Sequence, residues 1–265
     1  MTQGTDLLVD IGNSRIKWSL LPPASTKFSG QTSAVNWTLE NLTDILDAHW
    51  RSIGKSIQRI VVANVAGDDV QNRVKAWCNK HWQLEPQFVS TTAQFGAVKN
   101  GYQDYRELGV DRWLAVIAAH HLYPQQAIII IDCGTAITID TVLPDGRHRA
   151  GPIIAGRKTA IEALTRNTTF ANKQLDVENS ATEVFVSNTK NAVLSGANFA
   201  TAKALDAVIE QIQQKLSENR LEQPIKLIAT GGALTEIMSL TSLKDYDREP
   251  DLVLLGLWLV SAEES

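Results

Sequence analysis

Two short stretches decide the fold class of this chain: Asp10-Ile-Gly-Asn-Ser-Arg-Ile-Lys17 and Asp132-Cys-Gly-Thr-Ala-Ile-Thr138. Each follows an apolar run of the kind that forms a buried strand, Leu7–Asp10 in one case and Ala127–Asp132 in the other. Both read Asp-x-Gly followed by a polar and then a small residue, and the two aspartates stand 122 residues apart, close to half of the 265-residue chain. We therefore predict two copies of one folding unit, each opening with a strand, an Asp-x-Gly turn and a second strand.

The rest of the chain alternates between strand-like and helix-like segments, which is typical of the α/β class. We expect one lobe over residues 1–124 and the other over 125–265. The turn Pro144-Asp145-Gly146 has the composition of a hairpin turn. Strands are expected at Ile16–Leu21, Lys27–Gln31, Ile57–Val62, Thr135–Leu143 and Ile225–Thr230, and helices at Leu39–Trp50, Val70–His81, Asp111–Leu122, Thr189–Leu216 and Leu252–Val260.

Composition excludes several classes of protein. The chain has 25 Lys and Arg residues against 29 Asp and Glu residues, a net charge of −4 with no basic cluster, which argues against nucleic-acid binding. Charged residues interrupt the first 21 positions, so no signal peptide is expected, and the longest apolar run, Leu252–Val260, is shorter than the ~20 residues that span a bilayer. Two cysteines make no disulfide framework. We expect a soluble, cytoplasmic protein that binds neither nucleic acid nor membrane.

The Asp-x-Gly turns suit the binding of phosphate groups. A glycine lets the backbone approach a ligand closely, and N–H groups in such a turn can point at phosphate oxygens. Asn13, Ser14 and Thr135 add side-chain donors, and Lys17 supplies a positive charge. An aspartate at a strand end can hold a hydrated Mg²⁺. One such turn alone favours an ordinary hairpin, but two copies followed by Thr230-Gly231-Gly232-Ala233 favour a nucleotide site that grips the phosphates from both sides.

The combined motifs resemble the actin, sugar-kinase and heat-shock-chaperone ATPase superfamily. Within it, the chain is similar to type III pantothenate kinases along nearly its whole length. Two segments resemble the phosphate motifs of the family, Asp10–Lys17 and Asp132–Thr138, and Thr230–Ala233 resembles its adenosine motif. Two others resemble the segments that contact the substrate: Tyr102 with Leu108–Trp113 is similar to the pantothenate motif, and Thr189 with Ser195-Gly196 to the segment that reaches the substrate of the partner subunit. Pro250–Leu252 with Gly256-Leu257 resembles the closing segment of the family.

The resemblance implies a fold, an activity and a set of cofactors. The fold would be two ribonuclease-H-like lobes with a nucleotide cleft between them. The first lobe would carry the first phosphate turn and the catalytic base, and the second lobe the other phosphate turn, the adenosine motif and a dimerisation helix. The activity would be ATP-dependent phosphorylation of pantothenate to 4′-phosphopantothenate, the first step of coenzyme A biosynthesis. The enzyme would be a homodimer that needs Mg²⁺ and a monovalent cation, K⁺ or NH₄⁺.

The resemblance also implies roles for individual residues. Asp111 would be the general base, Asp132 would bind the monovalent cation, and Asp10 would bind Mg²⁺. The residues implied for ATP are Asp10, Ile11, Gly12, Asn13, Ser14, Arg15, Ile16, Lys17, Thr135, Gly231 and Gly232, and those implied for the substrate are Tyr102, Gly109, Val110, Asp111, Arg112 and Thr189.

Each of these residues also has a purely structural interpretation. Asp111 and Thr189 would cap helices, Asp132 would be a turn residue at a strand end, and Arg112 would form a surface ion pair. Tyr102 would be a partly buried aromatic residue. The five histidines show no spacing of metal ligands, so we interpret all of them as structural.

The chain departs from the family pattern in three places. Ala155 and Tyr105 stand where the family usually has proline, and the segment 167–175 lacks the usual small residues.

Three other functions stay open at this point. They are a catalytically silent regulatory relative that keeps the nucleotide fold, a chaperone or filament ATPase, and a phosphatase acting on polyphosphate or nucleotides. Asp111 argues against the silent relative, because such a protein has no need of a base there.

Overall fold

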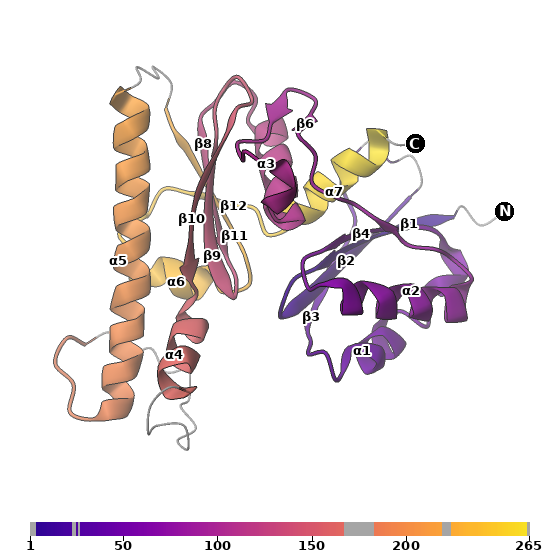
Figure 1. Ribbon diagram of the computed structural model, residues 1–265, viewed down its shortest axis with the longest axis horizontal. Helices are drawn as coiled ribbons and strands as arrows, with labels where there is room; N and C mark the ends of the chain where they lie inside the picture. Colours follow the sequence, from indigo (N-terminus) through magenta and orange to yellow (C-terminus); the bar gives the residue numbers. More distant parts are fainter. Residues whose placement is uncertain (1–3, 23–24, 26, 167–182, 219–223, 264–265) are drawn as a thin grey trace. The chain divides into compact units, whose positions relative to one another are not determined.

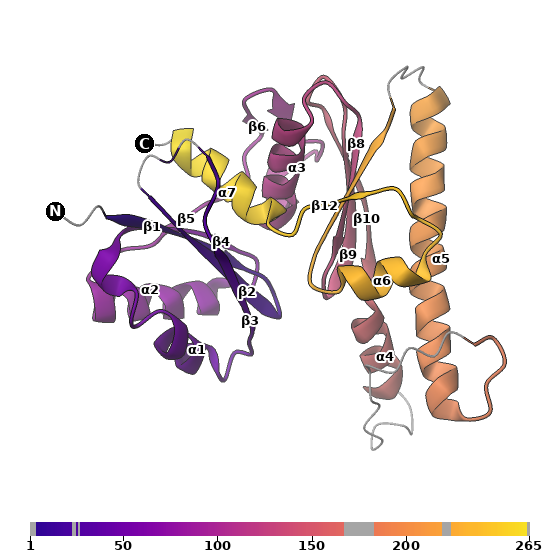
Figure 2. The same ribbon diagram turned by 180° about the vertical axis from the view of Figure 1, so that it is seen from behind.

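The protein consists of two compact α/β units in a computed structural model that describes residues 4–22, 25, 27–166, 183–218 and 224–263 (Figures 1 and 2). The first unit takes the described residues of Met1–Leu122, Asp145–His148 and Asp251–Ser265, and the second takes those of Tyr123–Pro144 and Arg149–Pro250. Each unit is built on its own five-stranded sheet. None of the helices in these described ranges combines the length and the apolar character that a membrane span requires.

The first sheet has the strand order β3-β2-β1-β4-β5. Its central strand β1 (Thr5–Ile11) runs antiparallel to β2 (Arg15–Leu21) and parallel to β4 (Ile57–Asn64). The edge strands are β3 (Thr32–Asn36), antiparallel to β2, and β5 (Gln87–Phe88), parallel to β4.

The second sheet repeats this plan with the order β10-β9-β8-β11-β12. Strand β8 (Ile128–Cys133) pairs antiparallel with β9 (Ala136–Val142) and parallel with β11 (Lys226–Thr230). The edges are β10 (His148–Ala155) and β12 (Asp247–Arg248). Because the strand order matches, and β8 pairs with β9 and β11 as β1 pairs with β2 and β4, the predicted duplication of one strand–turn–strand unit is confirmed.

Helices cover the sheets within each unit. In the first unit, α1 (Leu42–His49) and α2 (Asp68–Trp82) lie on one face of the sheet, and α3 (Val110–Leu122) and α7 (Leu252–Glu263) on the other (Figure 1). In the second unit the helices are α4 (Arg157–Arg166), α5 (Thr189–Glu218) and α6 (Leu234–Leu240). The remaining elements are the short ribbon of β6 (Gln94–Phe95) and β7 (Val98–Lys99) and two 3₁₀ turns, η1 (Gly54–Ser56) and η2 (Tyr105–Glu107).

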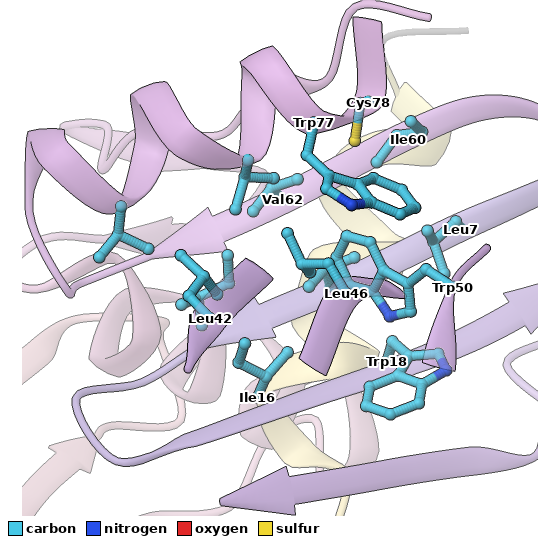
Figure 3. Packing of buried hydrophobic residues seen from close by; sticks show 14 of the residues in the cluster. Leu7, Ile16, Trp18, Leu42, Leu46, Trp50, Ile60, Val62, Trp77 and Cys78 are labelled. Atoms are coloured by element: carbon cyan, nitrogen blue, oxygen red, sulfur yellow. The ribbon is translucent and has the colours of Figure 1, made fainter. Parts of the chain in front are cut away.

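Trp18, Trp50 and Trp77 lie in the core of the first unit among leucine, isoleucine and valine side chains (Figure 3). Trp50 is almost fully buried, and its ring lies edge-on to Trp77 with the centroids 6.1 Å apart. The Trp77 indole N–H reaches the rim of the core and donates to Asp47 Oδ1 at 3.0 Å. Burying each such side chain stabilises the fold by about 1.5–3 kcal/mol, so this face of β1 is a rigid support for the turn at its end.

Three expectations about the fold are wrong. Residues Lys27–Gln31 form no strand, and the third strand is β3, whose side chains are mostly exposed and therefore lack an apolar pattern. Strand β10 has no counterpart among the expected strands, because it is an edge strand whose side chains are also mostly exposed. Helix α7 belongs to the first unit and not to the second, because it packs on α3, with Gly256 against the backbone of Leu114.

Candidate active site

The first Asp-x-Gly turn joins β1 to β2 in a tightly closed loop. The Gly12 N–H donates to the Arg15 carbonyl oxygen at 3.0 Å, and a Cβ on Gly12 would lie 3.3 Å from that oxygen. The buried Trp37 fixes the turn from the side, because its indole N–H donates to the Gly12 carbonyl at 3.0 Å and its backbone N–H to the Ser14 carbonyl at 3.1 Å. The side chains of Asn13, Ser14 and Arg15 are exposed. The backbone of this turn is therefore held in place while its tip faces outward.

Asp10 and Lys17 flank this turn as direct cross-strand partners, so their side chains share one face of the sheet. The Lys17 Nζ also lies 3.9 Å from Oδ1 of Asp251, the residue before α7. The sequence does not predict this contact, because 234 positions separate the two residues. The closing segment of the chain thus brings a carboxylate to the lysine that we expect to bind phosphate.

The predicted base Asp111 is held over a glycine. Helix α3 begins at Val110, and its first turn is closed by the Trp113 N–H donating to the Gly109 carbonyl at 3.0 Å. The Asp111 Oδ1 accepts the Arg112 N–H at 2.7 Å, and a Cβ on Gly109 would lie only 2.6 Å from that oxygen. The carboxylate therefore occupies the space that any other side chain at position 109 would fill. The alternative interpretation of Asp111 as the helix cap is wrong, because Gly109 holds the cap position.

Asp111 and the first phosphate turn share one end of the first sheet. The Cβ position of Gly109 is 3.9 Å from Val65 Cγ1, directly after β4. The Val65 N–H in turn donates to the Ile11 carbonyl at 3.0 Å, at the last residue of β1. Strands β1 and β4 are parallel, so both groups lie at the carboxyl ends of these strands, where ligands bind in open α/β sheets.

Two further predicted substrate residues contact each other beside Asp111. The Arg112 Nη1 donates to the Tyr102 hydroxyl at 3.0 Å, and the guanidinium carbon lies 5.8 Å from the centre of the Tyr102 ring. Arg112 is only 6% exposed, so the interpretation as a surface ion pair is wrong. A buried guanidinium is suited to a bidentate contact with a carboxylate or a phosphate.

In the second unit, the equivalent turn between β8 and β9 is held by Gly156, which lies between β10 and α4. The Thr135 carbonyl oxygen accepts the Gly156 N–H at 3.1 Å and the Thr159 hydroxyl at 2.6 Å. A Cβ on Gly156 would lie 2.5 Å from the same oxygen, so only glycine fits. Sequence analysis did not single out Thr159, and no local pattern distinguishes it. The replacement of the usual proline by Ala155 leaves this contact in place.

The predicted adenosine motif packs on the start of the same turn. Gly231 has a left-handed φ of +101°, and a Cβ there would lie 2.3 Å from the Cys133 carbonyl oxygen and 2.5 Å from Asp132 Oδ1. The Ala233 N–H donates to the Cys133 carbonyl at 2.9 Å. The structure therefore brings Asp132 and the double glycine together at the end of β8.

Thr189 belongs to a different unit from the other predicted substrate residues. It is the exposed first residue of α5 in the second unit, whereas Tyr102 and Asp111 belong to the first. The Asn191 N–H donates to Asn188 Oδ1 at 2.9 Å, so Asn188 caps the helix and the interpretation of Thr189 as the cap is wrong. The departure at 167–175 lies outside the described residues.

The site offers no thiol chemistry. Burial, with a smaller effect of the Asp132 carboxylate, raises the pKa of Cys133 to about 12, so this thiol stays protonated at neutral pH. Among the described residues, no group of three or more His, Cys, Asp or Glu side chains forms a metal site made of protein ligands alone. Any metal here would keep most of its ligands as water or substrate oxygens, which is the usual behaviour of Mg²⁺.

Two five-stranded units of one topology, each with an Asp-x-Gly turn after its central strand, give the chain the actin-like or sugar-kinase-like fold. The family model for type III pantothenate kinases matches residues 6–211. A type III pantothenate kinase from Nitrosococcus oceani is 34% identical over 264 residues, which cover 98% of this chain and 94% of that protein. The chain belongs to the type III pantothenate kinase family.

Solved structures support the fold independently. A putative Baf family transcriptional activator from Campylobacter jejuni aligns with a TM-score of 0.56 at 19% identity, covering 97% of this chain and 98% of that one. The activator of 2-hydroxyisocaproyl-CoA dehydratase from Clostridium difficile aligns with a TM-score of 0.50 at 12% identity, covering 98% and 95%. At these identities the likeness shows the fold alone.

Proposed function

We propose that this chain transfers the γ-phosphoryl group of ATP to the primary hydroxyl of pantothenate, giving 4′-phosphopantothenate in the first step of coenzyme A biosynthesis. Family membership gives the reaction. The observation that carries it to this chain is the Asp111 carboxylate, held over Gly109 at the sheet end that also bears the first phosphate turn. A catalytically silent relative would not need this arrangement.

Asp111 is proposed to accept the proton of the attacking hydroxyl. A carboxylate held by packing against Gly109 and by the Arg112 N–H is fixed before substrate arrives, as positioning catalysis requires. Phosphoryl transfer depends mostly on positioning and charge neutralisation, so a single well-placed base is a sufficient protein contribution at the acceptor side.

Tyr102 and Arg112 are proposed to recognise pantothenate, together with the backbone at Gly109 and Val110. Pantothenate carries one carboxylate, which matches the fork of a guanidinium. The hydroxyl of Tyr102 orients the Arg112 guanidinium, because it accepts one of its N–H groups. Burial of Arg112 strengthens its interaction with an anion, because little water competes for it.

The residues of Asp10–Lys17, with Thr135, Gly231 and Gly232, are proposed to bind ATP. The first turn would hold phosphate oxygens by its N–H groups, and the Lys17 ammonium, oriented by Asp251, would add positive charge. Because Gly231 has no Cβ, its backbone lies directly against the Asp132 side chain and the Cys133 carbonyl. The nucleotide would contact this group of atoms.

The two proposed cations fit the residues present. Asp10 offers the single carboxylate at a strand end that a hydrated Mg²⁺ takes, and the metal would neutralise phosphate charge when bound. Asp132 offers a carboxylate beside the packed carbonyl of Cys133, which suits the oxygen preference of K⁺, and NH₄⁺ would be held by the same acceptors.

A homodimer is proposed to bring Thr189 of one subunit to the substrate of the other. Large apolar side chains are exposed in the same unit as α5, and a second copy of the chain would cover such a surface. Within α5, Ala197 packs against Ile161 and Leu194 inside the unit, whereas Ala200 is exposed. The exposed apolar residues are Ile153, Leu164, Val184, Phe185 and Phe199.

The test of the function is an assay of ADP release against a panel of small alcohols, with and without K⁺. ADP release that requires pantothenate is expected, whereas release without an acceptor would indicate a phosphatase. Asp111→Asn should lower kcat by roughly 10²–10⁴. The matched control is His121→Ala, an exposed position on the same helix. Near-normal turnover of folded Asp111→Asn would remove Asp111 from the mechanism.

The location and remaining partners are also proposals. We place the reaction in the cytoplasm, where ATP is available, with pantothenate and a second copy of the chain as the only partners. Fractionation of cells, followed by the ADP-release assay on each fraction, tests the location. Activity confined to a membrane fraction would contradict it.

A further inference from the structure

His148 is a buried histidine that the proposed mechanism leaves without a role. It is only 2% exposed and is the first residue of β10. Although its neighbours in the chain form the second sheet, the segment Asp145–His148 belongs to the first unit. A buried polar ring at the point where the chain leaves one unit and returns to the other needs a physical explanation.

The segment Asp145–His148 packs closely on the loop that leads to the substrate motif. The Lys99 N–H donates to the Gly146 carbonyl at 2.9 Å. Gly146 has a left-handed φ of +80°, and a Cβ there would lie 2.2 Å from the Ala97 carbonyl oxygen. A glycine is therefore required for this approach, and the segment is held against β7 by backbone contacts on both sides.

The imidazole of His148 continues this contact to the residue before Tyr102. The Gly101 N–H donates to His148 Nδ1 at 3.3 Å. A neutral imidazole that accepts at Nδ1 carries its proton on Nε2, so the contact fixes the tautomer of the ring. Next along the chain, the Tyr102 N–H donates to Asn100 Oδ1 at 3.0 Å, and the Tyr102 hydroxyl accepts from Arg112 at 3.0 Å.

We propose that His148 is a positioning residue for the acceptor substrate. By accepting the Gly101 N–H, it holds the Gly101-Tyr102 backbone so that the Tyr102 hydroxyl orients the Arg112 guanidinium toward the carboxylate of the substrate. This inference rests on the proposed function, because it assigns Arg112 to that carboxylate. It predicts that His148 affects binding of the acceptor and leaves binding of ATP unchanged.

A purely structural role makes a different prediction. If His148 only fills space, its loss would lower stability and affect both substrates alike, and any side chain of similar volume would restore function. Asn and Gln separate the two roles. Asn places a polar atom near the position of Nδ1, whereas Gln places it near that of Nε2, so only Asn can accept the Gly101 N–H.

The experiment measures KM for pantothenate, KM for ATP and kcat in wild type, His148→Ala, His148→Asn and His148→Gln. His148→Ala and His148→Gln should raise KM for pantothenate by about 10-fold, the effect of leaving one buried donor without its partner, with KM for ATP within 2-fold of wild type. His148→Asn should stay within 3-fold of wild type. His121→Ala, at an exposed histidine, should change nothing.

Hydrogen exchange at the Gly101 amide gives a readout that does not depend on activity. Its exchange should speed up in His148→Ala and His148→Gln and stay slow in His148→Asn. Equal kinetics and exchange in Asn and Gln variants, or parallel losses for both substrates, would overturn the proposal, even if His148→Ala fails to fold. A wild-type protein that does not phosphorylate pantothenate would instead overturn the proposed function.

Discussion

Replacing Gly109 with alanine should separate catalysis from stability. A Cβ at position 109 would lie 2.6 Å from Asp111 Oδ1, whereas carbon and oxygen atoms in ordinary contact are about 3.3–3.6 Å apart. The carboxylate must therefore move by about 0.7–1 Å. Because the carboxylate is the terminal group of its side chain, rotation of that side chain relieves the clash at little cost in stability. Loss of the glycine cap costs up to about 1 kcal/mol, and the lower entropy of the unfolded chain offsets about 0.4–1 kcal/mol of it.

We therefore expect Gly109→Ala to keep its Tm within a few degrees and to lose about 10- to 100-fold in kcat, because a displacement of 1 Å costs that much in a positioned site. The assays are thermal unfolding by circular dichroism and ADP release with pantothenate. The control is a double-mutant cycle with Asp111→Ala, which has no Oδ1 to displace, so that Gly109→Ala should cost nothing further there. A folded Gly109→Ala enzyme with wild-type kcat would refute the reasoning.

Three other results follow from the site and its supports. Asp10→Ala should weaken Mg·ATP binding in calorimetric titration much more than pantothenate binding, and equal affinities with unchanged kcat would remove Asp10 from the metal site. Ala200→Arg should place a charge in the proposed dimer interface on α5, so that light scattering reports monomers and activity falls with dilution. A wild-type protein that is active as a monomer would contradict the proposed dimer. Hydrogen bonds from Lys226 and Tyr123 lower the pKa of Asp247 in the folded protein. This carboxylate therefore stabilises the fold at pH values above about 4, the pKa of an aspartate in the unfolded chain, and the effect is lost as the pH falls from there through the lower folded pKa. Asp247→Asn should thus show a smaller fall in Tm between pH 5 and pH 3, and an unchanged acid limb would exclude the effect.

The central strands of the fold were predictable because burial leaves a local pattern. The unbroken apolar runs of β8 and β1 follow directly from strands packed on both faces. Edge strands β3 and β10 leave no such pattern, because most of their side chains face water. Helix α7 is apolar on all sides, which predicts burial but does not say in which unit, since its partners on α3 are far away in the sequence.

The candidate site was predictable where glycine and charged residues occur in one short motif. Asp10, Gly109 and Asp111 are of this kind, and the structure places them at one end of the first sheet. The contacts of Asp251 with Lys17 and of His148 with Gly101 have no such signature. Each joins segments more than 40 positions apart, so only the fold brings them together.

The division of the chain also determines when the first unit can be completed during synthesis. Helix α7 covers a face of the first sheet, and Gly256 approaches the Leu114 carbonyl so closely that a Cβ would lie 2.1 Å from it. A ribosome emits the chain from its N-terminus, so β1, β4 and α3 are exposed long before their covering helix exists. The second unit is made entirely within that interval. Helix α7, which covers the first sheet, is therefore made after the whole second unit. Until residues 252–263 emerge, the nascent protein exposes the part of the first sheet that α7 covers.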